Sequence, residues 1–290
     1  MTSPLISVAQ LADRLAHPQE GAPIVVVDCR FNLADTQAGQ TAWQRAHIPG
    51  ARHADLDEDL SGAQTGRNGR HPLPDASTFA QTLQRWGIGE QTTVVAYDDA
   101  GGMFAARLWW MLTHWWGHAR CAVLDGGWQQ WTAQGRPTAS AASASPASGS
   151  TIGHPQPRAR PEEVILCEEV LASIGDPGRL LLIDARAPDR FRGENETLDP
   201  VGGHIPGAVN RFFKDNLDAS GCFKPPGRLR EEFTALIGAQ PLRSCIHQCG
   251  SGVTACHNLL AMDVAGLTGS RLYAGSWSEW CAEPSRPVAR

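Results

Sequence analysis

The chain has 290 residues, a formal net charge of -5 and 42% hydrophobic residues. Its length exceeds that of one domain of common size, and its hydrophobic residues can fill two cores. The negative net charge argues against non-specific nucleic-acid binding, which needs clustered cations. No apolar run reaches the roughly 18 residues of a membrane span. The N-terminus lacks the basic start and apolar stretch of a signal peptide. We therefore expect a cytoplasmic protein that binds neither nucleic acid nor membrane.

Strand and helix patterns alternate along the first half of the chain. Ser7 precedes an amphipathic pattern and is expected to cap a short helix. The continuous apolar runs IVVVDCR (24–30) and TTVVAYDD (92–99) predict buried parallel strands. Residues 77–87 and 103–117 have helical patterns, each ending at a glycine suited to a helix C-cap. This alternation predicts an α/β fold with helices covering a mainly parallel sheet.

The composition changes abruptly at TASAASASPASGST (138–151), which is small, polar and of low complexity. Such a stretch is typical of a flexible linker. We expect a linker over residues 138–160 between one domain at 1–137 and another at 161–290.

The two sides of the linker resemble each other. Four landmarks recur in the same order: IVVVDCR (24–30), AHIPGAR (46–52), TTVVAYDD (92–99) and VLDGGWQQW (123–131) on the first side, and LLLIDAR (180–186), GHIPGAV (203–209), SCIHQCG (244–250) and LYAGSWSEW (272–280) on the second. Helical patterns at residues 229–238 and 252–266 alternate with the later strands, as in the first half. The repetition predicts two homologous α/β domains in tandem.

The chain has eight cysteines: Cys29, Cys121, Cys167, Cys222, Cys245, Cys249, Cys256 and Cys281. Without a targeting signal they are expected to be reduced thiols, with disulfide pairing as the weaker alternative. No C-x-x-C pair occurs, which argues against a zinc site. We expect neither a metal nor a cofactor.

Cys249 stands at the mouth of a glycine-rich turn. An apolar run at 242–248 predicts a strand that ends at this cysteine, and a helix is expected to begin near Val253 or Thr254. Ligands of parallel sheets bind at the carboxyl ends of strands. The intervening glycines let backbone N–H groups converge as a nest for an anion, and the helix adds the positive end of its dipole. Both effects favour a thiolate, which is a nucleophile.

Other positions provide internal comparisons for Cys249. Cys245 lies within the strand pattern and Cys256 within the helical one, as expected for buried structural cysteines. In the first copy Asp98 occupies the place of Cys249. A carboxylate cannot carry out thiol chemistry, so we expect the first domain to be non-catalytic.

The doubled pattern DxR, HIPGA, strand–loop–helix and GSW resembles the rhodanese homology domain over nearly the whole chain. The loop CGSGVTA (249–255) resembles that of 3-mercaptopyruvate sulfurtransferases. The resemblance implies an inactive N-terminal domain, a catalytic C-terminal domain and a catalytic cysteine that takes sulfur from a small-molecule donor as a persulfide. The acceptor would be a thiol, such as thioredoxin or a low-molecular-weight thiol, or cyanide.

Loop charge separates two donors. Thiosulfate sulfurtransferases of this family carry CRKGVT, with two cations suited to a dianion. Here those positions are the neutral Gly250 and Ser251. A neutral loop suits 3-mercaptopyruvate, whose single carboxylate is remote from its sulfur.

A donor carboxylate favours arginine, which binds it with two parallel hydrogen bonds. Arg190, in the RF pair, matches the family's substrate-binding arginine, whereas Arg186 is expected to be mainly structural, paired with Asp184 or a loop carbonyl. Many relatives have a second carboxylate-binding arginine further along. Residues 194–203 contain none, which leaves Arg192 as a substitute.

The resemblance also assigns roles outside the second half. Asp57 matches an aspartate proposed to relay a proton with the loop serine, here Ser251, and His71 matches a histidine near the substrate. His47 and His204 recur in both HIPG copies and are expected to fix a turn. The substrate-binding set is completed by the loop positions Gly250, Gly252, Val253 and Thr254.

Three alternatives differ in chemistry. A thiosulfate:cyanide sulfurtransferase is disfavoured by the uncharged loop. A cysteine phosphatase needs an arginine six places after its cysteine, where this chain has Ala255. A non-enzymatic persulfide carrier would not need Arg190.

Overall fold

A computed structural model describes residues 3–18, 21–141, 158–176 and 178–290; most of the predicted linker lies outside these ranges. The chain forms two compact units. The first comprises Met1–Ser61, Pro74–Ala159 and Ser220–Cys222, and the second comprises Gly62–Leu73, Arg160–Ala219 and Phe223–Arg290. The segment Gly62–Leu73 therefore packs with the second half of the chain, although the sequence places it in the first. The predicted boundaries at 137 and 161 stay a prediction.

The first unit contains a five-stranded parallel sheet in the order β1-β5-β4-β2-β3. Its strands are β1 (Leu5–Ile6), β2 (Ile24–Asp28), β3 (Arg52–His53), β4 (Thr93–Tyr97) and β5 (Cys121–Leu124). The two apolar runs predicted as buried parallel strands are β2 and β4, and the structure pairs them along their whole length.

The helices of the first unit are α1 (Val8–Ala16), α2 (Ala38–Arg45), α3 (Ala76–Trp86), α4 (Ala105–Trp110) and α5 (Gly127–Ala133). The predicted N-cap of α1 is confirmed, because the Ser7 hydroxyl accepts from the Gln10 amide at 3.2 Å. Gly87 ends α3 in the left-handed conformation, as predicted. The helix predicted over 103–117 is shorter: α4 is followed by a π-helix at Met111–Trp115.

The second unit contains a four-stranded parallel sheet in the order β7-β6-β8-β9. Its strands are β6 (Leu181–Asp184), β7 (Val209–Asn210), β8 (Cys245–Gln248) and β9 (Arg271–Leu272). Its α-helices are α6 (Cys167–Leu171), α7 (Pro188–Phe191), α8 (Pro226–Ile237), α9 (Thr254–Val264) and α10 (Ser276–Trp280). Short 3₁₀ helices occupy Pro161–Glu163, Phe213–Asn216 and Leu242–Ser244. The strand predicted from residue 242 therefore begins only at Cys245.

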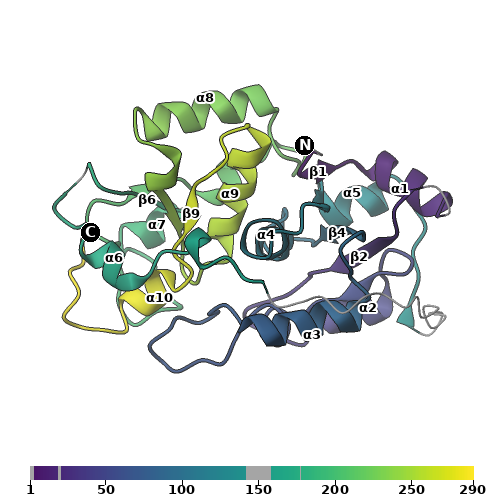
Figure 1. Ribbon diagram of the computed structural model, residues 1–290, viewed down its shortest axis with the longest axis horizontal. Helices are drawn as coiled ribbons and strands as arrows, with labels where there is room; N and C mark the ends of the chain where they lie inside the picture. Colours follow the sequence, from purple (N-terminus) through teal and green to yellow (C-terminus); the bar gives the residue numbers. More distant parts are fainter. Residues whose placement is uncertain (1–2, 19–20, 142–157, 177) are drawn as a thin grey trace. The chain divides into compact units, whose positions relative to one another are not determined.

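Alternating side chains of the second sheet build two cores, because successive residues of a strand face opposite sides. Leu182 and Ile246 pack with Trp277 and Trp280 of α10, whereas Ile183 packs on the other face with Ile237 of α8 and Cys245. Figure 1 shows the same arrangement, with α8 and α9 on one side of this sheet and α6 and α10 on the other. The loop after β8 thus emerges between two helical layers.

In the first unit, α1 and α5 cover one sheet face. Val8 and Leu11 of α1 and Trp131 of α5 pack against β2, β4 and β5. Helix α4 contacts β4 and β5. Within the described ranges, every helix is too short or too polar to cross a lipid bilayer.

Candidate active site

Cys249 follows the last residue of β8 and is only 3% exposed. Its amide donates to the hydroxyl of Ser276 at 3.1 Å, and its carbonyl accepts from the amide of Trp277 at 3.0 Å. Ser276 adopts φ +55°, which non-glycine residues rarely occupy. The start of α10 therefore fixes the backbone of Cys249, and the predicted position of the cysteine at the carboxyl end of a strand is confirmed.

The loop after Cys249 has a backbone that requires glycine at one position. Gly252 has φ +77°, and a Cβ there would lie 2.4 Å from the carbonyl oxygen of Ala274. Helix α9 begins at Thr254, as predicted. Over the described ranges, the loop amides that donate no hydrogen bond are those of Gly250, Ser251, Val253 and Thr254.

The sulfur of Cys249 accepts no hydrogen bond from any residue that the structure describes. Stabilisation of a Cys249 thiolate by the loop amides stays a prediction. Four donors at the start of a helix nevertheless remain available to an anionic group that extends beyond the sulfur.

The first copy shows such a loop with its anion in place. The carboxylate of Asp98 accepts at 2.8–2.9 Å from four amides, those of Ala100, Gly102, Phe104 and Ala105. Burial raises the pKa of Asp98, against the effect of these hydrogen bonds. The Asp98 carbonyl accepts from the amide of Trp128 at 2.8 Å, as the Cys249 carbonyl does from Trp277. The predicted correspondence of Asp98 and Cys249 is confirmed.

Ser251 and His71 lie together. The hydroxyl oxygen of Ser251 is 2.7 Å from Nδ1 of His71, and both residues are buried. His71 reaches this loop because its segment, Gly62–Leu73, belongs to the second unit. Asp57 belongs to the first unit, where its amide donates to Asp55; burial, with Asp55 nearby, raises the pKa of Asp57. A relay that includes Asp57 stays a prediction.

Arg186 has the structural contacts predicted for it. Its guanidinium donates to both oxygens of Asp184 and, at 2.8 Å, to the carbonyl of Gly203. It also stacks 4.8 Å from the ring centre of Trp277. The side chain is 1% exposed.

The first copy repeats these contacts without a cysteine. Arg30 donates to Asp28 and to the carbonyl of Ala46, and it lies 4.5 Å from the ring centre of Trp128. An arrangement found in both copies is independent of chemistry. We infer that Arg186 joins the HIPG turn to the sheet, and its role in substrate binding stays a prediction.

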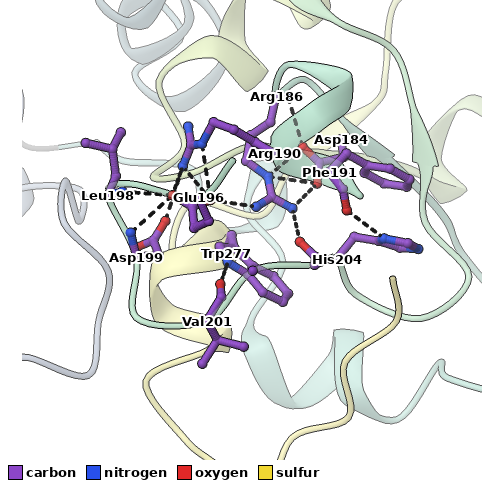
Figure 2. Close-up of polar contacts among 12 residues, drawn as sticks. Asp184, Arg186, Arg190, Phe191, Glu196, Leu198, Asp199, Val201, His204 and Trp277 are labelled. Atoms are coloured by element: carbon purple, nitrogen blue, oxygen red, sulfur yellow. Dashed lines mark hydrogen bonds and ion pairs between the residues drawn. The ribbon is translucent and has the colours of Figure 1, made fainter. Parts of the chain in front are cut away.

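Arg190 is more accessible and is held by two carboxylates. Its Nη2 lies 2.8 Å from Glu196 and 3.4 Å from Asp199, and its Nε donates to Glu196 at 3.1 Å. Figure 2 shows Glu196 at the centre of this group, where it also accepts from the amides of Leu198 and Asp199. Burial opposes ionisation of Glu196, but the hydrogen bonds from Arg190 and Leu198 prevail and lower its pKa. Burial raises the pKa of Asp199, despite the nearby charge of Arg70.

Arg70 is a site residue that the sequence did not indicate. Its amide donates to the hydroxyl of Ser278 at 3.0 Å, and its Nη1 forms an ion pair with Asp199. A Cβ on Gly250 would lie 2.9 Å from Nη2 of Arg70 and 3.6 Å from Nη2 of Arg190. The loop side chains at Gly250 and Ser251 are neutral, as the sequence shows, but two guanidinium groups lie beside Gly250.

Arg192, which the sequence left as a substitute for the missing second arginine, is bonded to a carboxylate close to it in the chain. Arg192 donates at 2.8 Å from Nε and Nη2 to Glu194, and its side chain is 53% exposed. In the HIPG turns, Nδ1 of His204 bonds to the carbonyl of Phe191 and Nδ1 of His47 to that of Trp43. The HIPG histidine of each copy therefore bonds to a nearby backbone carbonyl, as expected for a residue that fixes the turn.

Comparison with known proteins follows the same division into two copies. The sequence profile of the Rhodanese-like domain matches residues 10–134 and again 166–283. The chain belongs to the rhodanese family. The two matches confirm the tandem rhodanese-like fold predicted from the repeated landmarks.

Rhodanese relatives resemble the chain over nearly its whole length. A probable 3-mercaptopyruvate sulfurtransferase of Pseudomonas aeruginosa is 47% identical over 287 residues, covering 98% of this chain and 97% of that protein. The putative thiosulfate sulfurtransferase SseB of Mycobacterium tuberculosis is 36% identical, covering 99% and 96%. The crystal structure of the 3-mercaptopyruvate sulfurtransferase SseA from Escherichia coli has a TM-score of 0.78 at 28% identity, covering 95% of this chain and 99% of that one.

The other cysteines of the chain are not paired with one another. All eight cysteines lie in the described ranges and are free thiols. Cys245 and Cys256 are buried in β8 and α9, as predicted. In the part of the chain that the structure describes, no three or more His, Cys, Asp or Glu side chains form a group that could hold a metal ion.

Proposed function

We propose that the protein is a 3-mercaptopyruvate sulfurtransferase in which Cys249 carries the transferred sulfur as a persulfide. One observation carries the proposal: a buried cysteine at the end of β8 opens a loop of uncharged side chains, in which the amides of Gly250, Ser251, Val253 and Thr254 have no acceptor among the described residues. The relationship to a probable 3-mercaptopyruvate sulfurtransferase over nearly the full chain supports it.

The transfer balances without a further reagent. The Cys249 thiolate attacks the sulfur of 3-mercaptopyruvate, and an S–S bond forms as the C–S bond breaks. The electron pair of the broken bond leaves with carbon as the enolate of pyruvate. The thiol proton of the donor ends on that carbon, so thiolate and mercaptopyruvate become persulfide anion and pyruvate. The outer sulfur extends one bond beyond Cys249, where the loop amides can donate hydrogen bonds to it and stabilise its negative charge.

Ser251 and His71 are placed to manage the proton. A hydroxyl hydrogen-bonded to an imidazole can pass a proton between the donor thiol and the developing enolate. Both groups are buried, so the proton is exchanged within the site rather than with bulk water.

In the second half-reaction an acceptor thiolate, or cyanide, attacks the outer sulfur and restores the Cys249 thiolate. The acceptor leaves as a persulfide or as thiocyanate. We propose a thiol such as thioredoxin or a small cellular thiol as the physiological acceptor.

Thiosulfate is the second candidate donor. The two guanidinium groups beside Gly250 favour it, because they could meet the charge of a dianion that the loop side chains cannot. The relationship to a putative thiosulfate sulfurtransferase points the same way. A persulfide carrier without a small donor is disfavoured, since it has no use for these arginines.

The deciding experiment compares kcat/KM for mercaptopyruvate and thiosulfate with one common acceptor. We expect the higher value for mercaptopyruvate; a preference for thiosulfate would assign the protein to the other donor class. In parallel, intact-mass analysis after donor treatment should show one added sulfur on wild type and on Cys222→Ser, and none on Cys249→Ser. An unchanged adduct on Cys249→Ser would refute the assignment of the nucleophile.

A further inference from the structure

Ser278, in the first turn of α10, bonds to two separate segments of the second unit. Its amide donates to the carbonyl of Gly250 at 2.9 Å. Its hydroxyl donates to the carbonyl of Gly275 at 3.2 Å and accepts from the amide of Arg70 at 3.0 Å. One residue therefore holds both the loop that follows β8 and the segment that carries His71.

The segment that carries His71 lies closely against α10. Gly69 has φ +85°, and a Cβ there would lie 2.7 Å from the carbonyl oxygen of Gly275 and 3.2 Å from the hydroxyl oxygen of Ser278. Because a side chain has no room at this position, the backbone of the segment contacts the first turn of the helix directly. The two residues before His71, Gly69 and Arg70, are thus both in backbone contact with that turn.

Other bonds of Arg70 do not fix the peptide group that precedes His71. The carbonyl of Arg70 accepts from the side-chain amide of Gln64 at 2.7 Å, which closes the segment on itself. The side chain of Arg70 forms an ion pair with Asp199. An arginine side chain has several rotatable bonds, so this pair holds the guanidinium group rather than the backbone. The bond to Ser278, by contrast, acts on the backbone itself.

The first copy uses the corresponding residue differently. When VLDGGWQQW (123–131) is aligned with LYAGSWSEW (272–280), Gln129 stands at the place of Ser278. The side-chain amide of Gln129 donates to the carbonyl of Asp99, the counterpart of Gly250. In the second copy the backbone amide of Ser278 bonds to this carbonyl, so its side chain is available for the segment that carries His71.

We propose that Ser278 is a positioning residue that sets His71 against Ser251; this rests on the proposed function. Its amide fixes Gly250, the residue before Ser251, and its hydroxyl fixes Arg70, the residue before His71. Both members of the 2.7 Å hydrogen bond therefore directly follow a residue that Ser278 holds. The bonds of Ser278 end on backbone groups, so its effect on the reaction passes through this pair.

The first test is kinetic. Ser278→Ala removes the hydroxyl that bonds to Arg70 and Gly275, but it keeps the backbone amide that holds Gly250. We expect it to lower kcat for mercaptopyruvate about 10- to 100-fold, the loss that a displacement of about 1 Å can cause. Ser278→Thr keeps the hydroxyl and should restore kcat to within about threefold of wild type. Gln129→Ala, at the corresponding place in the first copy, is the matched control and should leave kcat unchanged.

A double variant separates positioning from a general disturbance of the site. In a His71→Ala background, Ser278→Ala should lower kcat by less than about twofold, because the residue that it positions is already gone. A full loss in that background would overturn the proposal. A wild-type kcat for Ser278→Ala, while His71→Ala is impaired, would overturn it as well.

Hydrogen exchange tests the contact independently of the reaction. The amide of Arg70 should exchange about tenfold or more faster in Ser278→Ala than in wild type or Gln129→Ala, because its acceptor is lost. Equal exchange rates would overturn the role of Ser278, whichever donor the enzyme prefers. If His71→Ala leaves kcat unchanged while exchange at Arg70 still depends on Ser278, the positioning is supported and the proton-transfer role of His71 in the proposed function is overturned.

Discussion

Nδ1 of His71 lies 2.7 Å from the hydroxyl oxygen of Ser251, although the two residues are 180 positions apart in the chain. Ser251 is two residues after Cys249, so the imidazole is placed at the catalytic loop itself. The pair joins a residue of the first sequence copy to the loop of the second. This contact makes His71 a partner in the proposed proton transfer rather than a neighbour of the substrate alone.

We expect Ser251→Ala and His71→Ala each to lower kcat for mercaptopyruvate about 10²- to 10⁴-fold, the usual range for losing general acid–base catalysis. Because the two groups act as one unit, the double variant should be no worse than the more severe single variant. Ser285→Ala, at an exposed serine, is the control. Losses that multiply in the double variant would show that the residues act separately.

Gly252 and Gly250 should respond differently to alanine. Gly252→Ala forces a positive φ on a residue with a side chain and places its Cβ 2.4 Å from backbone, so we expect a loss of about 2–4 kcal/mol in the free energy of unfolding. At Gly250 the nearest atom is the far end of the Arg70 side chain rather than backbone, and Gly250→Ala should lose less than about 1 kcal/mol. Urea unfolding of both variants measures the difference, and equal losses would contradict the geometric argument.

Asp98 should be a stabilising residue. Asp98→Ala leaves four amides without their acceptor, three of them buried, and we expect it to lower the free energy of unfolding by about 3–5 kcal/mol. Asp99→Ala, at the exposed neighbour, should change it by less than about 0.5 kcal/mol. Denaturant titration of the full chain tests the pair. Similar values for the two variants would show that the loop amides find other acceptors.

Glu196 should make stability depend on pH. Its pKa in the folded chain is below the ordinary value of 4.5, so the unfolded chain binds more protons in this range and stability rises with pH. Glu196→Gln should lower the free energy of unfolding by about 1–3 kcal/mol at pH 7. The difference from wild type should shrink as pH falls below about 4.5. A difference that stays constant down to the acid transition would refute the lowered pKa; Glu231→Gln, on the surface of α8, is the control.

Much of the fold follows from local patterns. The runs IVVVD and TVVAY contain little but β-branched and apolar residues, and they are the paired central strands β2 and β4. The repeated landmarks predict the tandem fold because a duplicated order of strand and turn is visible without any contact information. Helix ends were predicted where capping chemistry is local, as at Ser7 and Gly87.

Predictions failed where packing overrides pattern. The apolar periodicity of 103–117 gives no sign of the π-helix at Met111–Trp115, in which Met111, Leu112 and Trp115 are all buried. Leu242 looks like the start of a strand but belongs to a 3₁₀ turn. In the site, Arg70 was missed because its segment is a loop without periodicity, and its importance comes from a long-range contact with Asp199.

Because Gly62–Leu73 packs with the second unit, cutting the chain at the linker would separate the second half from part of its own site. A fragment starting at residue 161 would contain Cys249 and its loop but neither His71 nor Arg70. The first sequence copy, which has Asp98 at the place of the cysteine, therefore supplies parts to the site of the second copy. Engineering a minimal enzyme would require grafting this twelve-residue segment onto the second half, rather than cutting the chain at the linker.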